Sequence, residues 1–375
     1  MDFLRKPGRK LTRQMTDHFQ KNVYEFHEGS IDDIEMLGIK GANLCEMKRL
    51  NLPVPPGFII TTAACREYYE NGYEMTEHLL DLHRDAVYCI ERDSHKKFGG
   101  VTDDKPSPLL LSVRAGSTVK MPGQFESILN VGINDSIVDA IAGPHNRYRH
   151  FAVDTQRRFL QMFGTIVLKA DAGKYERILS HARERDGVDE DHKLSTDSLL
   201  YCIGEFKRIV DVPDDPYEQL RMAIEALFMQ WNEDRVADYR QAHSIPASAG
   251  VAVTVQQMVF GNMNSRSGTG IAVAANALKG GDYHIRGAYV RKGEGVDAVD
   301  GSRESASIWD VDPEIYDQLE RHFDTLQEHY NRDVQYVEFT VEDGKLYILE
   351  TSAVKMQPTV TDEGFVYVID AEDFR

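Results

Sequence analysis

Hydrophobic positions change their spacing along this chain, and the changes predict three kinds of segment. Short apolar runs with strand-like composition occur at 23–27 and 109–114, the second of them continuous, as in a strand covered on both faces. From about 136 to 229 the apolar residues follow a helical spacing in a more polar sequence. Strand-like runs return from 251 onward. This order predicts an α/β (α+β) fold with two lobes around a cleft and a helical insert.

Several elements have recognisable ends. Apolar residues share one face of a helix predicted over 39–50. Thr61 or Thr62 is placed to cap the next helix, which follows a β-rich run. Near the end of the chain, Asp312 is a natural N-cap and Pro313 suits the first position of a helix.

The same pattern divides the chain into units. We expect a basic, disordered leader at 1–22, a first lobe at 23–135, a helical insert at 136–215, a return to the first lobe at 216–252, a second lobe at 253–352 and a C-terminal tail at 353–375.

Charge and composition exclude some classes of function. The formal net charge of −18 argues against a nucleic-acid partner, because binding phosphate backbones needs a basic surface. No apolar run reaches the roughly 20 residues that span a bilayer, so we expect no membrane partner. The cysteines are widely spaced, which predicts reduced thiols and a cytoplasmic location. The basic leader leaves organelle targeting open. The cysteines are Cys45, Cys65, Cys89 and Cys202.

Two segments are candidates for binding phosphates. The run 261–270 is rich in Gly, Ser and Asn and follows a predicted strand. Its backbone N–H groups could approach phosphate oxygens, although a plain hairpin loop has the same composition. Lys40 and Arg114 are cations beside a predicted helix and at a predicted strand end, where they could hold phosphates or remain surface charges.

A predicted hairpin at 337–350 carries two candidate metal ligands. A three-residue loop at 342–344 would place Glu338 and Glu350 as diagonal neighbours, roughly 7–8 Å apart. At that spacing the two carboxylates could share a Mg²⁺ ion that carries phosphates. The alternative is a solvated polar face on an edge hairpin.

Taken in order, these segments resemble the N-terminal nucleotide-binding region of the pyruvate phosphate dikinase family, which is related to phosphoenolpyruvate synthase. The resemblance runs from about Val23 to Glu350. The stretches that carry it are KGANLCEM at 40–47, PPGF at 55–58, SVRAG at 112–116, MPG at 121–123, LNVGIND at 129–135, RRFLQMF at 157–163, VQQMVFGN at 255–262, SGTG at 267–270 and the hairpin.

The resemblance implies an ATP-grasp-like fold with ATP between two lobes and Mg²⁺ on its phosphates. It implies that Lys40 and Arg114 contact phosphates and act in catalysis. It also implies that Glu338 binds the metal, with Glu350 as a second ligand. In the family a phosphoryl group moves from ATP to a histidine on a separate swivelling domain. We expect that histidine on another protein, because this chain has no counterpart of that domain or of the barrel that follows it. The remaining nucleotide contacts implied are Gln256, Met258 and Val259 beside the adenine and Ser267, Gly268, Thr269 and Gly270 over the phosphates.

Departures from the family pattern leave the activity open. An acidic residue is replaced by Tyr336, cations are replaced by Ser352 and Ala275, and a second acid is replaced by Ala288. Fewer charges at a transferring phosphoryl group weaken its stabilisation by up to several kcal/mol for each lost donor. Nearby Arg291 and Lys292 are candidates to compensate.

Three hypotheses follow. The chain is a phosphotransferase domain that acts on a histidine protein in trans, or a catalytically impaired pseudoenzyme that binds nucleotide as a regulatory or interaction module, or a scaffold that keeps only the fold.

Overall fold

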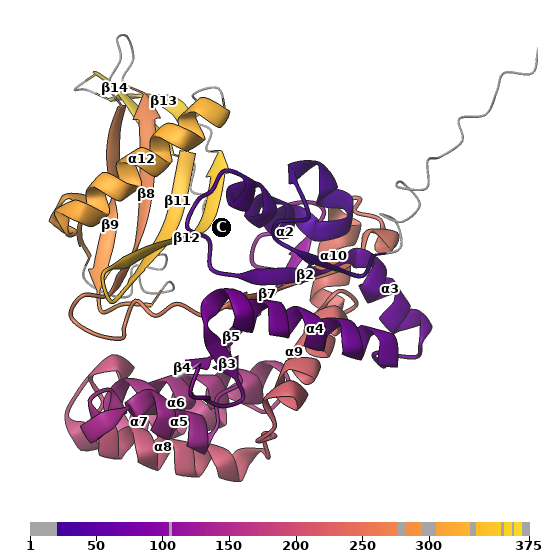
Figure 1. Ribbon diagram of the computed structural model, residues 1–375, viewed down its shortest axis with the longest axis vertical. Helices are drawn as coiled ribbons and strands as arrows, with labels where there is room; N and C mark the ends of the chain where they lie inside the picture. The colour runs from indigo at the N-terminus through magenta and orange to yellow at the C-terminus, as the bar shows by residue number, and fades with distance from the viewer. Residues whose placement is uncertain are drawn as a thin grey trace, which may run out of the picture.

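The computed structural model describes residues 21–104, 107–276, 283–294, 305–330, 335–353, 356–361 and 364–369. Two five-stranded antiparallel sheets and a layer of helices make up these residues (Figure 1). The predicted mixed α/β architecture is confirmed. Most of the predicted leader and the last residues of the predicted tail lie outside the described residues.

The first sheet has the order β1-β2-β7-β5-β6. Its strands are β1 (Val23–Glu25), β2 (Gly57–Ile60), β7 (Val251–Gln257), β5 (Leu111–Ser117) and β6 (Ser127–Val131). Every residue of the central strand β7 is buried, because helices cover both faces of this sheet. The covering helices are α2 (Ile34–Arg49), α3 (Thr62–Glu70), α4 (Glu77–Ser94) and α9 (Pro216–Gln230), and α10 (Asp234–Ala242) follows α9.

The second sheet has the order β10-β9-β8-β11-β12. Helix α12 (Pro313–His329) packs on its outer face through Ile315, Leu319 and Phe323 (Figure 1). Its strands are β10 (Ala306–Ser307), β9 (Tyr283–Arg291), β8 (Gly268–Asn276), β11 (Gln335–Glu342) and β12 (Lys345–Ala353), and β13 (Met356–Thr361) pairs with β14 (Gly364–Ile369) beyond it.

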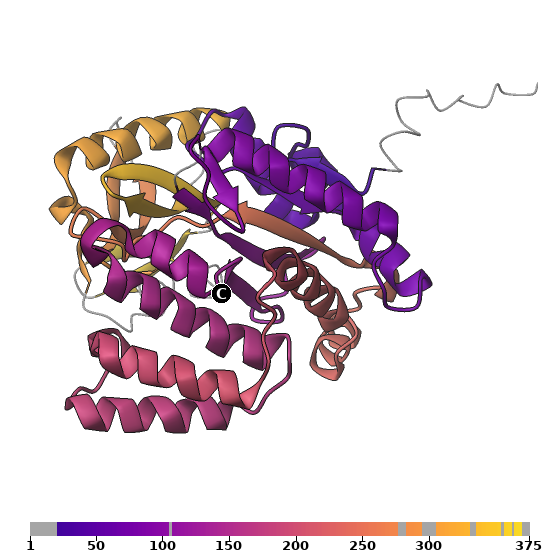
Figure 2. The same cartoon turned by 60° about the horizontal axis from the view of Figure 1, so that its bottom comes forward.

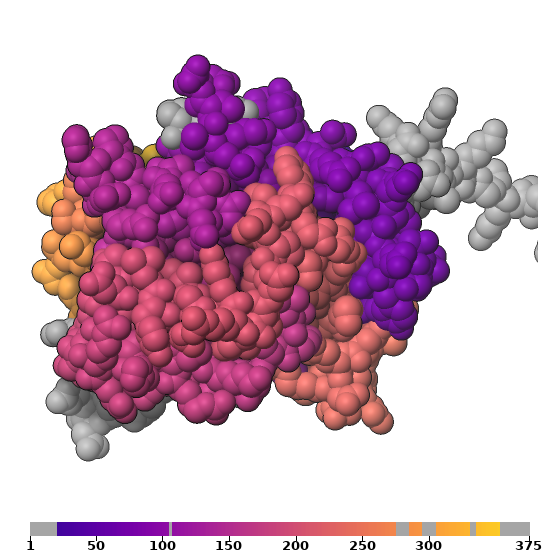
Figure 3. Space-filling model, turned by 90° about the horizontal axis from the view of Figure 1, so that it is seen from below, coloured from indigo at the N-terminus to yellow at the C-terminus, as the bar shows by residue number. Residues whose placement is uncertain are grey.

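The helical segment forms a separate layer below the first sheet (Figure 2), and it covers much of the molecule when seen from below (Figure 3). Helices α6 and α7 both pack on α8, and α6 also contacts β6. The helices of this layer are α5 (Asp135–Ala142), α6 (Arg149–Ile166), α7 (Ala172–Asp186) and α8 (Thr196–Ile209). The predicted mainly helical stretch is therefore confirmed, whereas the exact limits of the units stay predictions.

Helix α2 joins the two sheets. It starts earlier than the predicted residue 39, and Gly38 interrupts it with a φ of 67°. A Cβ atom at Gly38 would lie 2.7 Å from the Gly116 carbonyl oxygen, so only glycine fits this close approach. Beyond the interruption, the Asn43 side-chain amide donates to the Thr351 carbonyl of β12. The Ile348 N–H of β12 donates to the Pro53 carbonyl, with an N···O distance of 3.1 Å.

Several predicted boundaries shift. The strand predicted at 109–114 is divided, because β4 (Ser107–Leu109) pairs in parallel with β3 (Lys96–Phe98) and β5 starts afresh at Leu111. The run that begins at 251 leaves the sheet after Gln257. Of the two candidate caps, Thr61 is the N-cap of α3, and Asp312 caps α12 as predicted.

All four predicted thiols are free: Cys45, Cys65 and Cys202 are buried and Cys89 is half-buried. Within the described part of the chain, no helix is long and apolar enough to cross a membrane.

A buried ion cluster lies within helix α6 of the helical layer. The Asp154 carboxylate accepts from Arg157 at 2.6 Å and from Arg158 at 2.8 Å. Burial raises the pKa of Asp154, but the two guanidinium groups outweigh it and hold the pKa at about 2. The carboxylate therefore adds stability above pH 4, and this contribution is lost as the pH falls toward 2.

We predict that Asp154→Asn lowers the free energy of unfolding by about 3 kcal/mol at pH 7, because it removes the carboxylate 2.6 Å from the buried Arg157 guanidinium and leaves only the more distant Asp191 at 3.8 Å. The difference from wild type should shrink as the pH falls from about 4 to about 2. Urea denaturation at both pH values measures it. The exposed pair of Asp139 with Arg149 provides the control, since Asp139→Asn should cost less than about 1 kcal/mol. Equal losses in the two variants would contradict the prediction.

Candidate functional site

Two neighbouring cavities lie where the two sheets meet. The first, here the β7 cavity, has a volume of about 290 Å³ and is lined by Arg114, Gln256 and the segment after β7. The second, here the α2 cavity, has a volume of about 500 Å³ and is lined by Lys40 and Glu350 among others. Glu338 lines both cavities, so it marks the point where they adjoin.

A β-bulge sets the position of Glu338. The turn at Asp343 and Gly344 has two residues with positive φ, not the predicted three-residue loop, because Glu342 pairs with Lys345. The register then shifts by one residue at Leu349, which follows Ile348 without a partner of its own. Glu338 and Glu350 therefore pair directly across the strands, and the predicted diagonal arrangement is wrong. Directly opposed residues have Cβ atoms only about 5 Å apart.

Lys40 lies against this pair of acids. Its Nζ atom is 2.8 Å from Oε2 of Glu350, and both side chains are about one-third exposed. Burial raises the pKa of Glu350, but Lys40 and Arg114 outweigh that effect, so its pKa is lowered. Glu350 is therefore ionised at neutral pH and holds Lys40 at the junction of the two sheets.

The pKa of Glu338 shifts in the opposite direction, upward. Burial and the neighbouring Glu350 charge raise its pKa, and Lys40 and Arg114 offset this only in part. The Tyr336 hydroxyl donates to Oε1 of Glu338 at 2.8 Å. Burial and the Glu338 carboxylate raise the pKa of Tyr336, so the phenol keeps its proton and serves as a donor.

Arg114 contributes a guanidinium group whose hydrogen-bonding capacity is not fully satisfied within the described residues. Its Nε atom is buried and has no hydrogen-bond partner among the described residues. An unpaired buried donor costs free energy, and Arg114 lines the β7 cavity beside Glu338. The guanidinium is therefore available to an anion in that cavity.

The far wall of the β7 cavity is made by the chain that connects the two sheets. Gln256 donates to the Pro55 carbonyl at 3.1 Å, and the Met258 N–H donates to the Leu110 carbonyl at 2.9 Å. Met258 and Val259 lie beyond the end of β7, not within it as the predicted strand required. All three residues line the cavity, and the wall they form is largely apolar.

The predicted phosphate loop is placed differently. Ser267 is buried, and its hydroxyl donates to Asn264 at 3.1 Å and accepts from the Asp343 N–H at 2.9 Å. Gly268, Thr269 and Gly270 begin strand β8, and none of the four lines either cavity. Their predicted contact with phosphates therefore stays a prediction, without support from their positions.

The acids at the junction suit a hard cation. No group of three or more His, Cys, Asp or Glu side chains that could hold a metal exists in the described ranges. Mg²⁺, however, is commonly held by one or two carboxylates together with substrate phosphates. Glu338 and Glu350 supply two carboxylates at one point, so the residues present fit Mg²⁺ bound along with a phosphate ligand.

Sequence reasoning missed some residues of the site. Glu294 lines the β7 cavity and accepts from Arg158 at 3.1 Å and from Asn262 at 2.7 Å. It lies three residues after the end of β9, in a stretch without hydrophobic periodicity that could have located it. Lys120 lines the α2 cavity and lowers the pKa of Glu350; only its nearness to the MPG stretch pointed to it.

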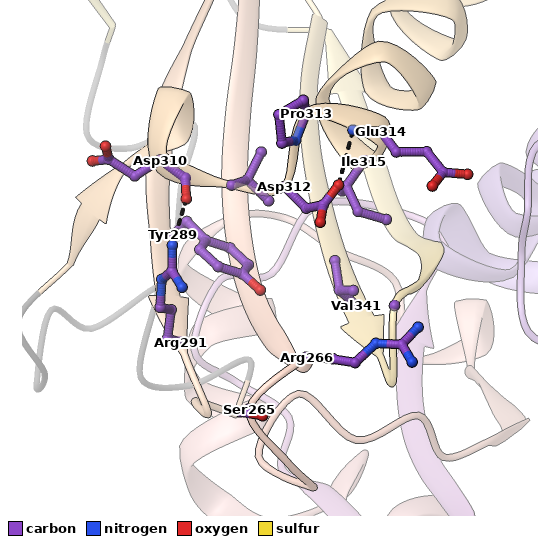
Figure 4. A pocket seen from close by; sticks show the side chains of 12 residues that line it. Ser265, Arg266, Tyr289, Arg291, Asp310, Asp312, Pro313, Glu314, Ile315 and Val341 are labelled. Carbon is purple, nitrogen blue, oxygen red and sulfur yellow. Dashed lines mark hydrogen bonds between the residues drawn. The ribbon is translucent and has the colours of Figure 1, made fainter.

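Arg291 does not supply a missing cation. Tyr289 stacks on Phe339, with ring centroids 6.1 Å apart, on the face of the sheet away from Glu338. Arg291 follows on that same face because side chains two apart in a strand point the same way. There it lines a separate cavity, and its guanidinium donates to the Asp310 carbonyl at 2.8 Å (Figure 4).

The positions that depart from the family pattern lie close to these acids. Tyr336 pairs with Ser352 across the hairpin, one step beyond Glu338 and Glu350, and both line the α2 cavity. Ala288 pairs with Ile271, which itself pairs with Glu338. The side chain of Ala275 lies outside the described residues.

Comparison with known proteins identifies relatives over nearly the whole chain. The family model "Pyruvate phosphate dikinase, AMP/ATP-binding domain" matches residues 34–98 and 90–310. The pyruvate, phosphate dikinase of Clostridium symbiosum is 37% identical over 92% of this chain and 41% of its own length. That of Rhizobium meliloti is 38% identical over the same shares, and the chloroplastic enzyme 1 of Zea mays is 34% identical over 95% of this chain and 38% of its own length. The chain spans about two fifths of these relatives.

We predict that Glu338→Gln stabilises the protein without ligands by about 0.5–2 kcal/mol at pH 7, since functional sites often carry such a cost. A carboxyl whose pKa is raised in the fold costs stability at pH values above its unfolded pKa. The gain should vanish near pH 4, where wild-type Glu338 is itself protonated. Urea denaturation at the two pH values measures it. As a control, Glu328→Gln on the exposed side of α12 should change stability by less than about 0.5 kcal/mol. A loss of stability in Glu338→Gln at pH 7 would contradict the prediction.

Proposed function

The chain belongs to the family of pyruvate phosphate dikinase AMP/ATP-binding domains, and from that premise we propose that it binds ATP with Mg²⁺ and passes a phosphoryl group to a histidine on a separate domain or protein. The observation that carries this proposal is the direct pairing of Glu338 with Glu350 beside Lys40 and Arg114. Acids for a metal and cations for phosphates meet there at one point between two cavities.

In this proposal the two cavities bind different parts of ATP. The apolar wall of the β7 cavity, with Met258 and Val259, suits the adenine ring, and the phosphates extend toward Glu338. Arg114 brings a buried, unpaired Nε donor to those phosphates, and a guanidinium matches phosphate geometry well. In this arrangement Lys40 reaches the terminal phosphate from the α2 cavity.

Mg²⁺ bound at Glu338 and Glu350 would neutralise phosphate charge and orient the terminal phosphoryl group. Glu350, which pairs with Lys40 in this structure, would hold the metal together with Glu338, and the ammonium group of Lys40 would then bind a phosphate oxygen. Tyr336 keeps Glu338 oriented through its hydroxyl.

The acceptor would approach through the α2 cavity, which has the larger volume of the two and is lined by Lys40. The acceptor in this proposal is a histidine on another domain or protein, and the chain spans about two fifths of the length of its relatives. The free, mostly buried thiols are consistent with a reducing, cytoplasmic setting.

A second candidate is a nucleotide-binding module that performs no transfer. It is favoured by Ser352, which brings no charge to the α2 cavity where the family pattern has a cation. It is also favoured by the Lys40–Glu350 ion pair, which a ligand must break before Lys40 can act. Both candidates require ATP binding and differ only in turnover.

We predict that MgATP raises the melting temperature. Occupancy at a hundred times the dissociation constant adds about 2.7 kcal/mol to the free energy of unfolding. Lys40→Ala combined with Arg114→Ala should abolish the shift, because it removes both cations at the phosphates. Thermal unfolding with and without millimolar MgATP measures it. No shift in the wild-type protein would overturn both candidates and leave the fold as a scaffold.

We predict that the wild-type chain transfers label from ATP, labelled in its terminal phosphate, to the isolated histidine domain of a relative. Because one preorganised donor is worth roughly 10²–10³ in rate, Ser352→Arg should accelerate the transfer by up to about that factor. Ser352→Gln, of similar length without charge, is the matched control. The second candidate would be established if the wild type binds ATP but transfers no label, and if Ser352→Arg transfers label while Ser352→Gln does not.

A further inference from the structure

A fourth cavity, here the α6 cavity, lies between the helical layer and the second sheet. It has a volume of about 410 Å³ and receives residues from the start of α6, from a 3₁₀ turn at Asp191–Lys193 and from the loop after β7. Its lining includes three side chains with fixed positive charge and two imidazoles: Arg147, Arg158, Lys292, His150 and His192. The family's nucleotide residues are absent from this lining, so the proposed nucleotide chemistry gives it no role.

The acid in this cavity is already neutralised. Asp154 lines it, but one carboxylate oxygen binds Arg157 and the other binds Arg158. Arg147 is exposed and, within the described ranges, makes no ion pair, with its guanidinium 5.1 Å from the centre of the Tyr148 ring. Arg147 therefore brings to the cavity a positive charge that no acid of the described residues pairs with, in a chain whose formal net charge is −18.

The inner end of the cavity offers a hydrogen-bond acceptor. Oδ1 of Asn262 is buried and has no partner, while its Nδ2 donates to Glu294 at 2.7 Å. An unpaired buried acceptor costs free energy, and a ligand hydroxyl would satisfy it. Positive charge at the rim and an acceptor at the inner end together suit a ligand with an anionic group and a hydroxyl.

The α6 cavity is separate from the β7 cavity. Phe151 of the α6 cavity packs edge-on against Phe260 of the β7 cavity, with ring centroids 5.1 Å apart. Beside them, Arg158 of the α6 cavity donates to Glu294 of the β7 cavity at 3.1 Å. These two contacts form a wall between the cavities, so a ligand in one does not occupy the other.

We propose that the α6 cavity binds a small hydroxylated phosphate ester, with Arg147 and Lys292 holding the phosphate and Asn262 accepting from a ligand hydroxyl. Guanidinium and ammonium groups bind phosphate through charge-assisted hydrogen bonds. The volume of the cavity lies within the range of small-molecule sites.

The test uses the full chain with Lys40→Ala and Arg114→Ala, so that phosphate binding at the nucleotide site does not contribute. Glycerol 3-phosphate, titrated calorimetrically, should bind this variant. Adding Arg147→Gln and Lys292→Gln should weaken the binding by at least about tenfold, because each charged hydrogen bond to phosphate is worth about that factor or more. Both residues are exposed, so these changes should leave the fold intact, which the melting temperature checks.

Two further variants test whether the ligand hydroxyl is recognised and whether the effect of the cations is specific to the cavity. Asn262→Leu should weaken glycerol 3-phosphate by more than it weakens methyl phosphate, which lacks the hydroxyl. Arg66→Gln with Lys174→Gln, two cations remote from the cavity, should leave the affinity unchanged. The proposal is overturned if glycerol 3-phosphate does not bind, or if Arg147→Gln with Lys292→Gln leaves its affinity unaltered. Failure of ATP binding in the wild type would sink the proposed function and leave this test unaffected.

Discussion

The contact between helix α2 and strand β12 is the constraint on which the geometry of the site depends. The Lys40–Glu350 ion pair lies in this contact, next to the hydrogen bond from Asn43 to the Thr351 carbonyl. Nε2 of His329 in α12 also contacts Oε1 of Glu46 in α2 at 3.0 Å. Since α2 packs on the first sheet and β12 belongs to the second, this contact fixes the distance between the cations of one lobe and the acids of the other.

The paired carboxyl groups of the site lower the stability of the folded protein. Two carboxyl groups face each other, and the pKa of Glu338 is raised while that of Glu350 is lowered. One acid is therefore satisfied by Lys40, and the other depends on a hydrogen bond from Tyr336. A cation that binds both acids would relieve their repulsion, which is why an arrangement unfavourable by itself is suited to a metal–phosphate ligand.

Much of this could be predicted from the sequence, and the failures have physical causes. Lys40, Arg114, Glu338 and Glu350 were identified because they occur in runs whose order resembles one family, and the structure brings them together. The bulge at Leu349 was not predictable, since it breaks the period of two from which cross-strand partners are counted. Glu294 was missed because its position depends on Arg158, which is remote in sequence and brought near only by tertiary packing.

Strand β12 has a further consequence for how the molecule can move. It is the last strand of its sheet, and in the described residues its outer edge bonds to the first lobe through Pro53 and Asn43. The lobe contact thus acts as a cover for a bare β-edge, which would otherwise be open to pairing with other chains. Wide separation of the lobes, or production of the second lobe alone, would expose this edge and favour self-association.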